Sequence, residues 1–434
     1  MVIFFMPLPA EQTEEQIPPA PAQAVHDPYA AFRSPAYRVF AMSFVLAVVG
    51  QQMISATIQW EIYEATGNLI YMAMIGLVQA LPILALALPA GQVADMFPRR
   101  RVMLVTQSVV VLGSTALAIC ALAGVLTPYV IYPILLADSI ALTFHRPARA
   151  SLLPAMVPMR DLASAITWNS TLFETFGVIA PALAGFIIAW SSPAIALLVA
   201  ALCLAGAMLL TTRLPDHRVA QKREPVTMQT LLAGIRFVFR TRLILAAMSL
   251  DLFAVLLGGA TILLPVFAKE MGIGAWGYGL LRAATPLGAI IMALLIAHLP
   301  PMKRAGRAML LAVAGFGAAT IVFGLSKNIW LSFAMLMLLG MFDNISVVVR
   351  HTLVQTLTPD SMRGRVNAVN QIFIGSSNEL GAVESATVAY FVGAVRSVVI
   401  GGVGTILVVI AVATMFPSMR RLGALRDQKP ESET

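Results

Sequence analysis

Long apolar stretches separated by short basic segments run through almost the whole chain. Twelve of these stretches are long enough to cross a bilayer, because a helix rising about 1.5 Å per residue needs about 20 apolar residues to span the hydrocarbon core. A chain of this kind folds only in lipid, so its chemistry takes place in or across a membrane. The expected spans cover residues 36–60, 69–94, 102–124, 128–150, 162–189, 194–212, 243–268, 276–298, 307–325, 329–350, 366–391 and 397–416.

The basic residues predict how the chain is oriented. If the N-terminus is cytoplasmic, 25 of the 29 Lys and Arg residues fall on the cytoplasmic side. The exceptions are Lys269, Arg282, Lys327 and Arg396. The positive-inside rule therefore predicts cytoplasmic termini, and we expect an integral, multi-pass protein of the bacterial inner membrane. Because the basic residues sit in short loops beside the spans, anionic lipid headgroups are the expected partner, and nucleic acid is not.

The composition excludes several classes of protein. With 59% hydrophobic and only 12% charged residues, a water-soluble fold would expose far too much apolar surface. Cys120 and Cys203 both fall inside spans, so no CxxC redox or metal site is present, and we expect no metal and no cofactor. No basic region followed by a cleavage site precedes the first span, which is therefore expected to be an uncleaved anchor.

The chain divides into two similar halves. Arg149 to Pro158, followed by Asn169, resembles Arg350 to Pro359, followed by Asn370, at a constant offset of 201, and Arg101-Val-Met-Leu resembles Arg307-Ala-Met-Leu. Two six-helix halves that rock about a central cavity are a transporter architecture. We predict a cytoplasmic tail (1–33), an N-terminal six-helix half (34–212), a cytoplasmic linker (213–242), a C-terminal six-helix half (243–417) and a second tail (418–434).

The loop between the second and third spans carries a recognisable motif. Gly91-Gln-Val-Ala-Asp95-Met-Phe-Pro98-Arg99-Arg100-Arg101 resembles the signature loop of the major facilitator superfamily. The resemblance implies a twelve-helix fold in two pseudo-symmetric halves and a cytoplasmic gate, to which we assign this loop and Arg350. A basic loop that only sets the topology is the alternative. The second-half counterpart, Ala297 to Arg307, lacks the Asp, so any carboxylate latch is asymmetric.

Further motifs resemble one branch of that superfamily, the enterobactin-exporter and macrolide-efflux type of transporter. They include Trp60 to Gly67, Asp251 to Leu256, Arg363 to Asn370 and Ser377 to Gly381. The resemblance covers nearly the whole membrane part and excludes the tails. It implies proton-coupled antiport, with a small molecule and protons as partners of a monomeric protein.

Six carboxyl groups fall inside the predicted spans. Each charge at mid-membrane costs about 2.5–3.5 kcal/mol, so such residues usually face a partner or a wet cavity. In the implied fold, spans 1, 4, 7 and 10 line the cavity. The cavity candidates are therefore Gln52, Ser55, Gln59, Asp138, Asp251 and Asp343, and the proton-coupling candidates are Asp343, Asp138, Asp251, Glu379, Glu174 and Glu384.

Some of these acids have an alternative, structural interpretation. Asp343 and Arg350 are seven residues apart and so share a helix face. Glu384 lies near the outer end of its span, where capping a loop or holding helices together is the alternative to proton coupling. Glu174 sits at a depth where helix-packing contacts are common, and Arg282 fits either a pairing partner or an interfacial anchor.

The chain lacks GxxxxGK[ST], HExxH and GxSxG motifs, so it shows neither an ATP engine nor the site of a membrane enzyme. The main hypothesis is a secondary active transporter, not an enzyme, that exports a small amphipathic or hydrophobic compound (siderophore-, macrolide- or drug-like) by proton-coupled alternating access. One alternative is a lipid or lysophospholipid flippase of the same fold. The other is a transport-inactive sensor or scaffold, against which the polar stripe Gln52, Ser55 and Gln59 speaks.

Overall fold

The regular structure in the computed structural model is entirely helical within the residues it describes, which are 27, 29–215, 228–300, 302–359 and 362–423. Most of the predicted N-terminal tail, the middle of the linker and most of the C-terminal tail lie outside these residues. The main helices are α1 (Pro35–Thr66), α2 (Leu69–Met96), α3 (Arg99–Leu122), α4 (Pro128–Leu152), α5 (Leu162–Trp190), α6 (Pro193–Thr211), α7 (Met228–Arg240), α8 (Arg242–Gly258), α9 (Leu264–Glu270), α10 (Gly274–His298), α11 (Ala305–Leu325), α12 (Ile329–Leu357), α13 (Arg363–Val392), α14 (Ala394–Met415) and α15 (Pro417–Arg421).

Ten described helical stretches are long and apolar enough to cross a membrane, with α8 and α9 counted as one. The other two long helices, α4 and α13, are more polar because they carry His145, Arg146, Arg149, Glu379 and Glu384 among others. Together these stretches agree with the twelve spans predicted from the sequence. The expected all-helical fold is confirmed.

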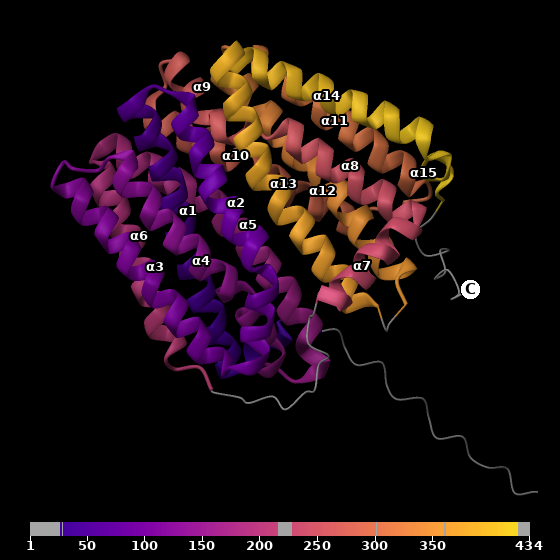
Figure 1. The fold of residues 1–434 in the computed structure, drawn as a ribbon, viewed down its shortest axis with the longest axis horizontal. Helices are drawn as coiled ribbons and strands as arrows, with labels where there is room; N and C mark the ends of the chain where they lie inside the picture. The colour runs from indigo at the N-terminus through magenta and orange to yellow at the C-terminus, as the bar shows by residue number, and fades with distance from the viewer. Residues whose placement is uncertain (1–26, 28, 216–227, 301, 360–361, 424–434) are drawn as a thin grey trace, which may run out of the picture.

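The two halves of the chain form two helix bundles (Figure 1). In the first half, which comprises α1 to α6, α1 packs on α5 and α6, while α4 packs on α2 and α3. In the second half, which comprises α8 to α14, α8 packs on α13 and α14, and α12 packs on α10 and α11. The halves meet along two seams, α5 against α10 and α2 against α13.

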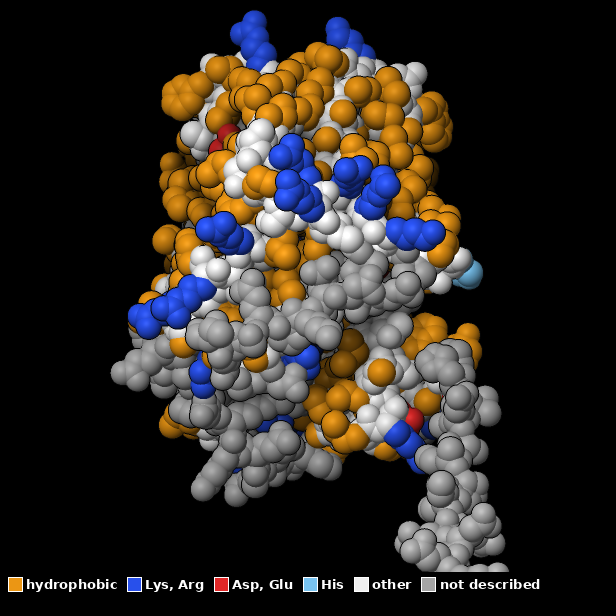
Figure 2. Space-filling view, turned by 90° about the vertical axis from the view of Figure 1, so that its right-hand side faces the viewer, with side chains coloured by type: hydrophobic (Ala, Val, Ile, Leu, Met, Phe, Trp, Pro, Cys, Tyr) orange, Lys and Arg blue, Asp and Glu red, His pale blue; other side chains and the backbone are white. Residues whose placement is uncertain are grey.

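We call the end of the bundle at which α1, α3, α5, α8, α11 and α13 begin the basic end, and the opposite end the distal end. Figure 2 shows Lys and Arg side chains gathered in a belt below an apolar surface on the second half. Exposed basic residues from the neighbouring helix termini and loops account for this charge at the basic end: Arg240, Arg242, Lys303, Arg304, Arg307, Arg420 and Arg421.

The seventh predicted span, residues 243–268, is one membrane-spanning stretch, as expected, but it is broken into two helices. The α-helix α8 ends at Gly258, a short 3-10 helix covers Ala260–Leu263, and α9 starts at Leu264 with Pro265 in its first turn. Two successive glycines weaken a helix, and a proline suits the first turn of a new one. A Cβ on Gly259 would lie 3.2 Å from the Gly381 backbone of α13, so the break also lets two helices approach closely.

Glycines allow the halves to touch on the distal side. A Cβ on Gly185 of α5 would lie 2.7 Å from the Cα of Gly279 in α10, and one on Gly279 would lie 2.8 Å from the carbonyl oxygen of Pro181. Small residues at such crossings bring helix backbones into contact, where dispersion forces and weak hydrogen bonds act. This seam therefore holds the distal ends of the two halves together.

The described part of the linker contains α7. Gly234 lies against the backbone of Arg365 in α13, and Val238 is buried among apolar residues of the second half. The sequence suggested that the segment around Ile235 to Phe239 lies along the membrane surface. In the structure, α7 packs onto α13 and α8 through Val238, while Leu232 and Phe239 of the same helix stay exposed.

Candidate functional site

A buried ion pair links three helices of the second half. Arg350 of α12 lies with Nη2 3.3 Å from Oδ2 of Asp251 in α8, and its Nη1 donates a hydrogen bond of 2.8 Å to Oδ1 of Asn370 in α13. Arg350 and Asp251 are only 3% and 6% exposed. Arg350, which the sequence assigned to the gate, thus lies inside one half and is held by a predicted cavity acid.

Asp343 lies on the same helix but is not part of that ion pair. It is partly exposed, and it has no hydrogen bond or ion pair with any described residue. The charged groups that act on it are Asp251, Arg350 and Glu174, the last of which belongs to α5 of the other half. Two of the predicted proton-coupling residues, Asp343 and Glu174, thus lie in different halves but within electrostatic range of each other.

Two further acids lie on α13. Glu379 is near the seam with α2, where its carbonyl oxygen would lie 2.8 Å from a Cβ on Gly76, and it interacts electrostatically with Arg146 of α4. Glu384 lies closer to the distal end, where Ser385 donates a hydrogen bond of 3.2 Å to its Oε2. The two acids therefore have different surroundings.

Asp138 lies inside the first half. It is 2% exposed, packs against Gly113 of α3, and neither of its carboxylate oxygens has a hydrogen-bond partner among the described residues. Although α4 as a whole was expected to line the cavity, this side chain points between α3 and α4. Its position separates it from the cluster around Asp343.

The polar stripe of α1 meets the second half. Arg282 of α10 donates a hydrogen bond of 2.9 Å from Nη2 to Oγ of Ser55, and its Nη1 bonds Oε1 of Gln59. Tyr278, one turn before Arg282, donates to the carbonyl oxygen of Ala56 at 3.2 Å. The sequence predicted Ser55 and Gln59 as substrate contacts but did not predict that Arg282 binds them. The available signal was that Arg282 is one of the four basic residues expected outside the cytoplasmic segments.

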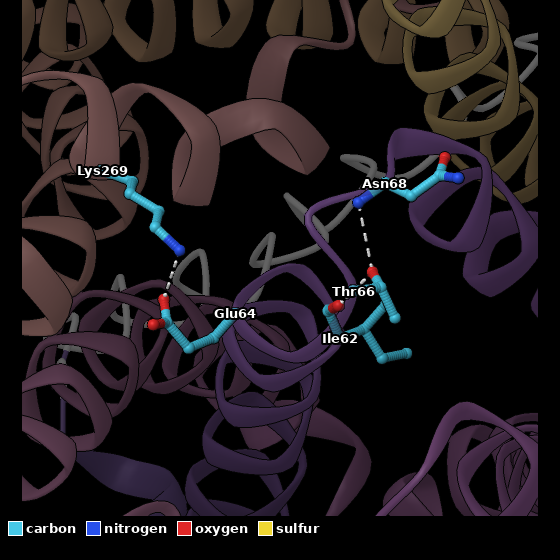
Figure 3. A network of polar contacts seen from close by, with 5 residues as sticks. All are labelled: Ile62, Glu64, Thr66, Asn68 and Lys269. Carbon is cyan, nitrogen blue, oxygen red and sulfur yellow. Dashed lines mark hydrogen bonds and ion pairs between the residues drawn. The ribbon is translucent and has the colours of Figure 1, made fainter.

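A second contact between the halves, an ion pair, lies closer to the distal end than the Arg282 cluster does. Figure 3 shows Lys269 of α9 pointing at Glu64 of α1, with Nζ 3.1 Å from Oε2. The same ammonium lies 5.7 Å from the ring centroid of Tyr63. Both partners are about half exposed, so this contact contributes less than the part-buried Arg282 cluster.

The predicted gate loop makes its described hydrogen bonds within the first half. Arg99 donates from Nη1 to the carbonyl oxygen of Ser151 at 2.8 Å, and Arg100 donates to the carbonyl oxygen of Thr212. Gly91 is partly buried, Arg101 is exposed, and the side chain of Asp95 lies outside the described residues. The role of this loop as a gate remains a prediction.

A cavity of about 230 Å³ opens in the first half between α1, α3, α4, α5 and α6. We call it the N-half pocket. Its wall is mainly apolar, and it includes Gln52, the third member of the α1 stripe. Further polar side chains on the wall come from α1, α3 and α4: Gln51, Gln107, His145, Arg146 and Arg149. Among the described residues no three His, Cys, Asp or Glu side chains gather as a metal site would require.

The Arg282 cluster leads to a first prediction. Arg282→Gln removes a charged donor shared by Ser55, Gln59 and Tyr278, so we expect the distal ends to separate more readily. Hydrogen bonds to charged groups are worth about 1.5–3 kcal/mol, which would change the closed-to-open ratio by roughly tenfold or more. Electron paramagnetic distance measurements between spin labels at positions 68 and 327 would report this ratio.

Arg396→Gln is the matched control, because Arg396 is exposed at the distal end and no described contact joins it to the first half. Label distances that are unchanged in Arg282→Gln would show that the cluster does not hold the halves together.

Comparison with known proteins agrees with this architecture. A family model described as transmembrane secretion effector matches residues 26–431. The enterobactin exporter EntS of Citrobacter koseri is 25% identical over 387 residues, which cover 89% of this chain and 93% of that protein. The enterobactin exporter EntS of Escherichia coli O1:K1 / APEC is 24% identical over 400 residues, 92% of this chain and 96% of that protein.

Solved structures show the same fold. The nucleoside transporter NupG matches with a TM-score of 0.69 at 16% identity, over 88% of this chain and 99% of its own. A bacterial homolog of the human lysosomal transporter Spinster, in an inward-facing and unoccupied conformation, matches with a TM-score of 0.66 at 15% identity. The match covers 91% of this chain and 99% of that protein. This chain is therefore a multi-pass protein of the bacterial inner membrane and belongs to the transmembrane secretion effector family of major facilitator transporters.

Proposed function

We propose that the chain exports a small amphipathic or hydrophobic compound in exchange for protons, by alternating access of its two halves. In this proposal the basic end faces the cytoplasm, as the positive-inside rule predicts, and both termini lie there. The distal contacts, Arg282 with the α1 stripe and Lys269 with Glu64, then close the outer side. With this orientation the structure is open to the cytoplasm, the state that the solved structure of the Spinster homolog also has.

One observation carries the proton coupling. Asp343 is a carboxyl group in a membrane-spanning helix, partly exposed, without a described hydrogen bond or ion pair, and electrostatically linked to Glu174 of the other half. An ionisable residue in such a place is expensive unless it works in an aqueous path. Because its neighbours change when the halves rock, its proton affinity would differ between the inward and outward states, which is what proton coupling requires.

The Asp251–Arg350 pair supports the same scheme. Asp251 and Arg350 both act electrostatically on Asp343, and their ion pair fixes where these two charges lie. Asp343 would therefore gain and lose its proton beside a fixed pair that is close to neutral. Glu379 and Glu174 are further candidates on the seam, while Asp138 and Glu384 lie away from it.

Reconstitution in liposomes tests the function. The purified chain, an imposed pH gradient and a panel of one siderophore, one macrolide and one cationic dye would be combined, with flux followed by the internal concentration of each compound. We expect at least one compound to be driven against its gradient and the flux to stop when a protonophore collapses the pH gradient. Folded protein that moves none of them, or that moves one equally well with the protonophore, would contradict the proposal.

A lipid cargo is a second candidate with an observation of its own. An apolar hollow of about 580 Å³ lies between α3 and the end of α2 on one side and α4 on the other, and Arg101 reaches its wall. An acyl chain would fit such a surface with its headgroup near the arginine. Transfer of a fluorescent lysophospholipid between leaflets in the same liposomes, at rates above protein-free vesicles, would favour this cargo over soluble compounds.

A further inference from the structure

The internal repeat places two arginines at equivalent positions, Arg149 in α4 and Arg350 in α12, each followed twenty residues later by an asparagine. In the second half this arrangement is complete, because Arg350 binds both Asp251 and Asn370. In the first half it is not. Oδ1 of Asn169 is buried without a hydrogen-bond partner among the described residues. Arg149 is absent from the ion pairs that the described residues form.

An aromatic ring meets Arg149 on one side. Its guanidinium carbon lies 4.1 Å from the ring centroid of Phe44 in α1, a cation–π contact. Such a contact uses none of the five N–H donors, and no hydrogen bond from them to another described residue is present. The neighbouring charge that acts on Arg149 is another arginine, Arg146. The N-half pocket therefore carries two positive charges on one helix, and only Arg146 has an acid, Glu379, within electrostatic range.

The remaining polar groups of the pocket are also incompletely used. Gln107 is 8% exposed and its Oε1 has no hydrogen-bond partner, and the same is true of Oε1 of Gln51. His145 is held by Thr106, whose Oγ1 lies 3.0 Å from Nδ1. Buried polar atoms are rarely left without partners, so such a group of them in one cavity points to a ligand.

We infer that the N-half pocket binds an organic anion with an apolar or aromatic body, and this inference, which rests on the proposed transport function, names the substrate class. The carboxylate, phosphate or sulfonate of the ligand would lie between Arg149 and Arg146. Its body would lie against Phe44, Val110 and Phe173, and its N–H or O–H groups would donate to Gln51 and Gln107. Arginine suits this task because its planar fork binds an oxyanion bidentately.

Three isosteric probes test the charge preference. Naphthalene-2-carboxylate, its neutral amide and naphthalen-2-ylmethylamine would be titrated calorimetrically into the full chain in phosphatidylcholine nanodiscs. We expect the carboxylate to bind roughly tenfold or more tightly than the amide, because its hydrogen bonds are to charged groups, and the amine to bind least. Equal affinity for the carboxylate and the amide would overturn the inference.

Variants locate the site. Arg149→Gln should remove the preference for the carboxylate, Arg149→Lys should keep part of it, and Arg160→Gln should keep all of it because that arginine is exposed on the surface of the first half. Phe44→Glu places a carboxylate against Arg149, as Asp251 is placed against Arg350, and should abolish anion binding while the protein stays folded. Unfolding temperatures and elution profiles would be measured for every variant, and a preference that persists in folded Phe44→Glu would refute the site.

Changing the lipid distinguishes a lipid headgroup from a soluble anion as the ligand of the N-half pocket. Nanodiscs that contain phosphatidylglycerol would weaken binding of the carboxylate in wild type, but not in Arg149→Gln, if a lipid headgroup occupies the pocket. Unchanged binding would assign the pocket to soluble anions. Absence of pH-driven flux with the binding intact would refute the proposed proton coupling and leave the anion site standing.

Discussion

Asp343→Asn is expected to reduce pH-gradient-driven transport to the level of protein-free liposomes while leaving the protein folded. Asparagine keeps the size of the side chain but cannot bind and release a proton. The position has no described hydrogen bond or ion pair to lose, and two of the three charged groups acting on it, Asp251 and Glu174, are also acids. Loss of one negative charge therefore leaves no buried partner unsatisfied.

Two measurements distinguish coupling from folding and binding. Exchange of labelled for unlabelled compound without a pH gradient should persist in Asp343→Asn, because rocking with bound substrate does not require the proton. Proton release on addition of substrate should decrease. Asp161→Asn is the control, because it removes an acid paired only with the surface residue Arg160. Full gradient-driven flux in Asp343→Asn would exclude Asp343 from the coupling mechanism.

Much of the fold follows from local features of the sequence. Length and hydropathy set the spans, and short polar segments set their ends. The predicted 128–150 and 194–212 become α4 and α6 with shifts of one or two residues, while the predicted 329–350 becomes α12, which continues to Leu357. Ser34, Asn68 and Asn328 cap helices with their side chains, as residues of these types often do. The break between α8 and α9 was not predicted, because apolar glycine pairs also occur within unbroken membrane helices.

Less of the candidate site than of the fold could be predicted from the sequence. The spacing of Asp343 and Arg350 gave their shared helix face, but the partners of Arg350 come from α8 and α13, about 100 residues before it and 20 after it. The rotation of each helix about its axis depends on packing with distant segments. For this reason Asp138 and Asp343, which the sequence treated alike, lie in different surroundings, and the link from Ser55 to Arg282 was not foreseen.

The asymmetry between the halves gives the repeat a functional meaning. Duplication supplies both halves with an arginine at the same place, but the second half neutralises it with Asp251, while the first half leaves it on the wall of the N-half pocket. Under the proposed function, the second half would bind the proton and the first half would recognise the cargo. Such a division would let substrate and proton occupy the transporter at separate sites.

Asp251→Ala is expected to cause the largest loss of stability of any substitution considered. It leaves the guanidinium of Arg350 buried with Asn370 as its one remaining described partner. Nε of Arg350 already lacks a hydrogen-bond acceptor among the described residues. Removing one partner of a buried ion pair costs about 3–5 kcal/mol, because the other charge remains desolvated. The free energy of unfolding in mixed micelles, measured by titration with denaturing detergent, should fall by that amount.

The double variant Asp251→Leu with Arg350→Met is the decisive comparison. Replacing both partners of a buried pair by apolar residues of similar volume is often neutral or stabilising, so this protein should unfold near wild type. It should nevertheless lose gradient-driven flux, since the two charges that act on Asp343 from α8 and α12 are gone. If the double variant is as unstable as Asp251→Ala, the cost arises from lost packing of α8 on α12 rather than from an unpaired charge.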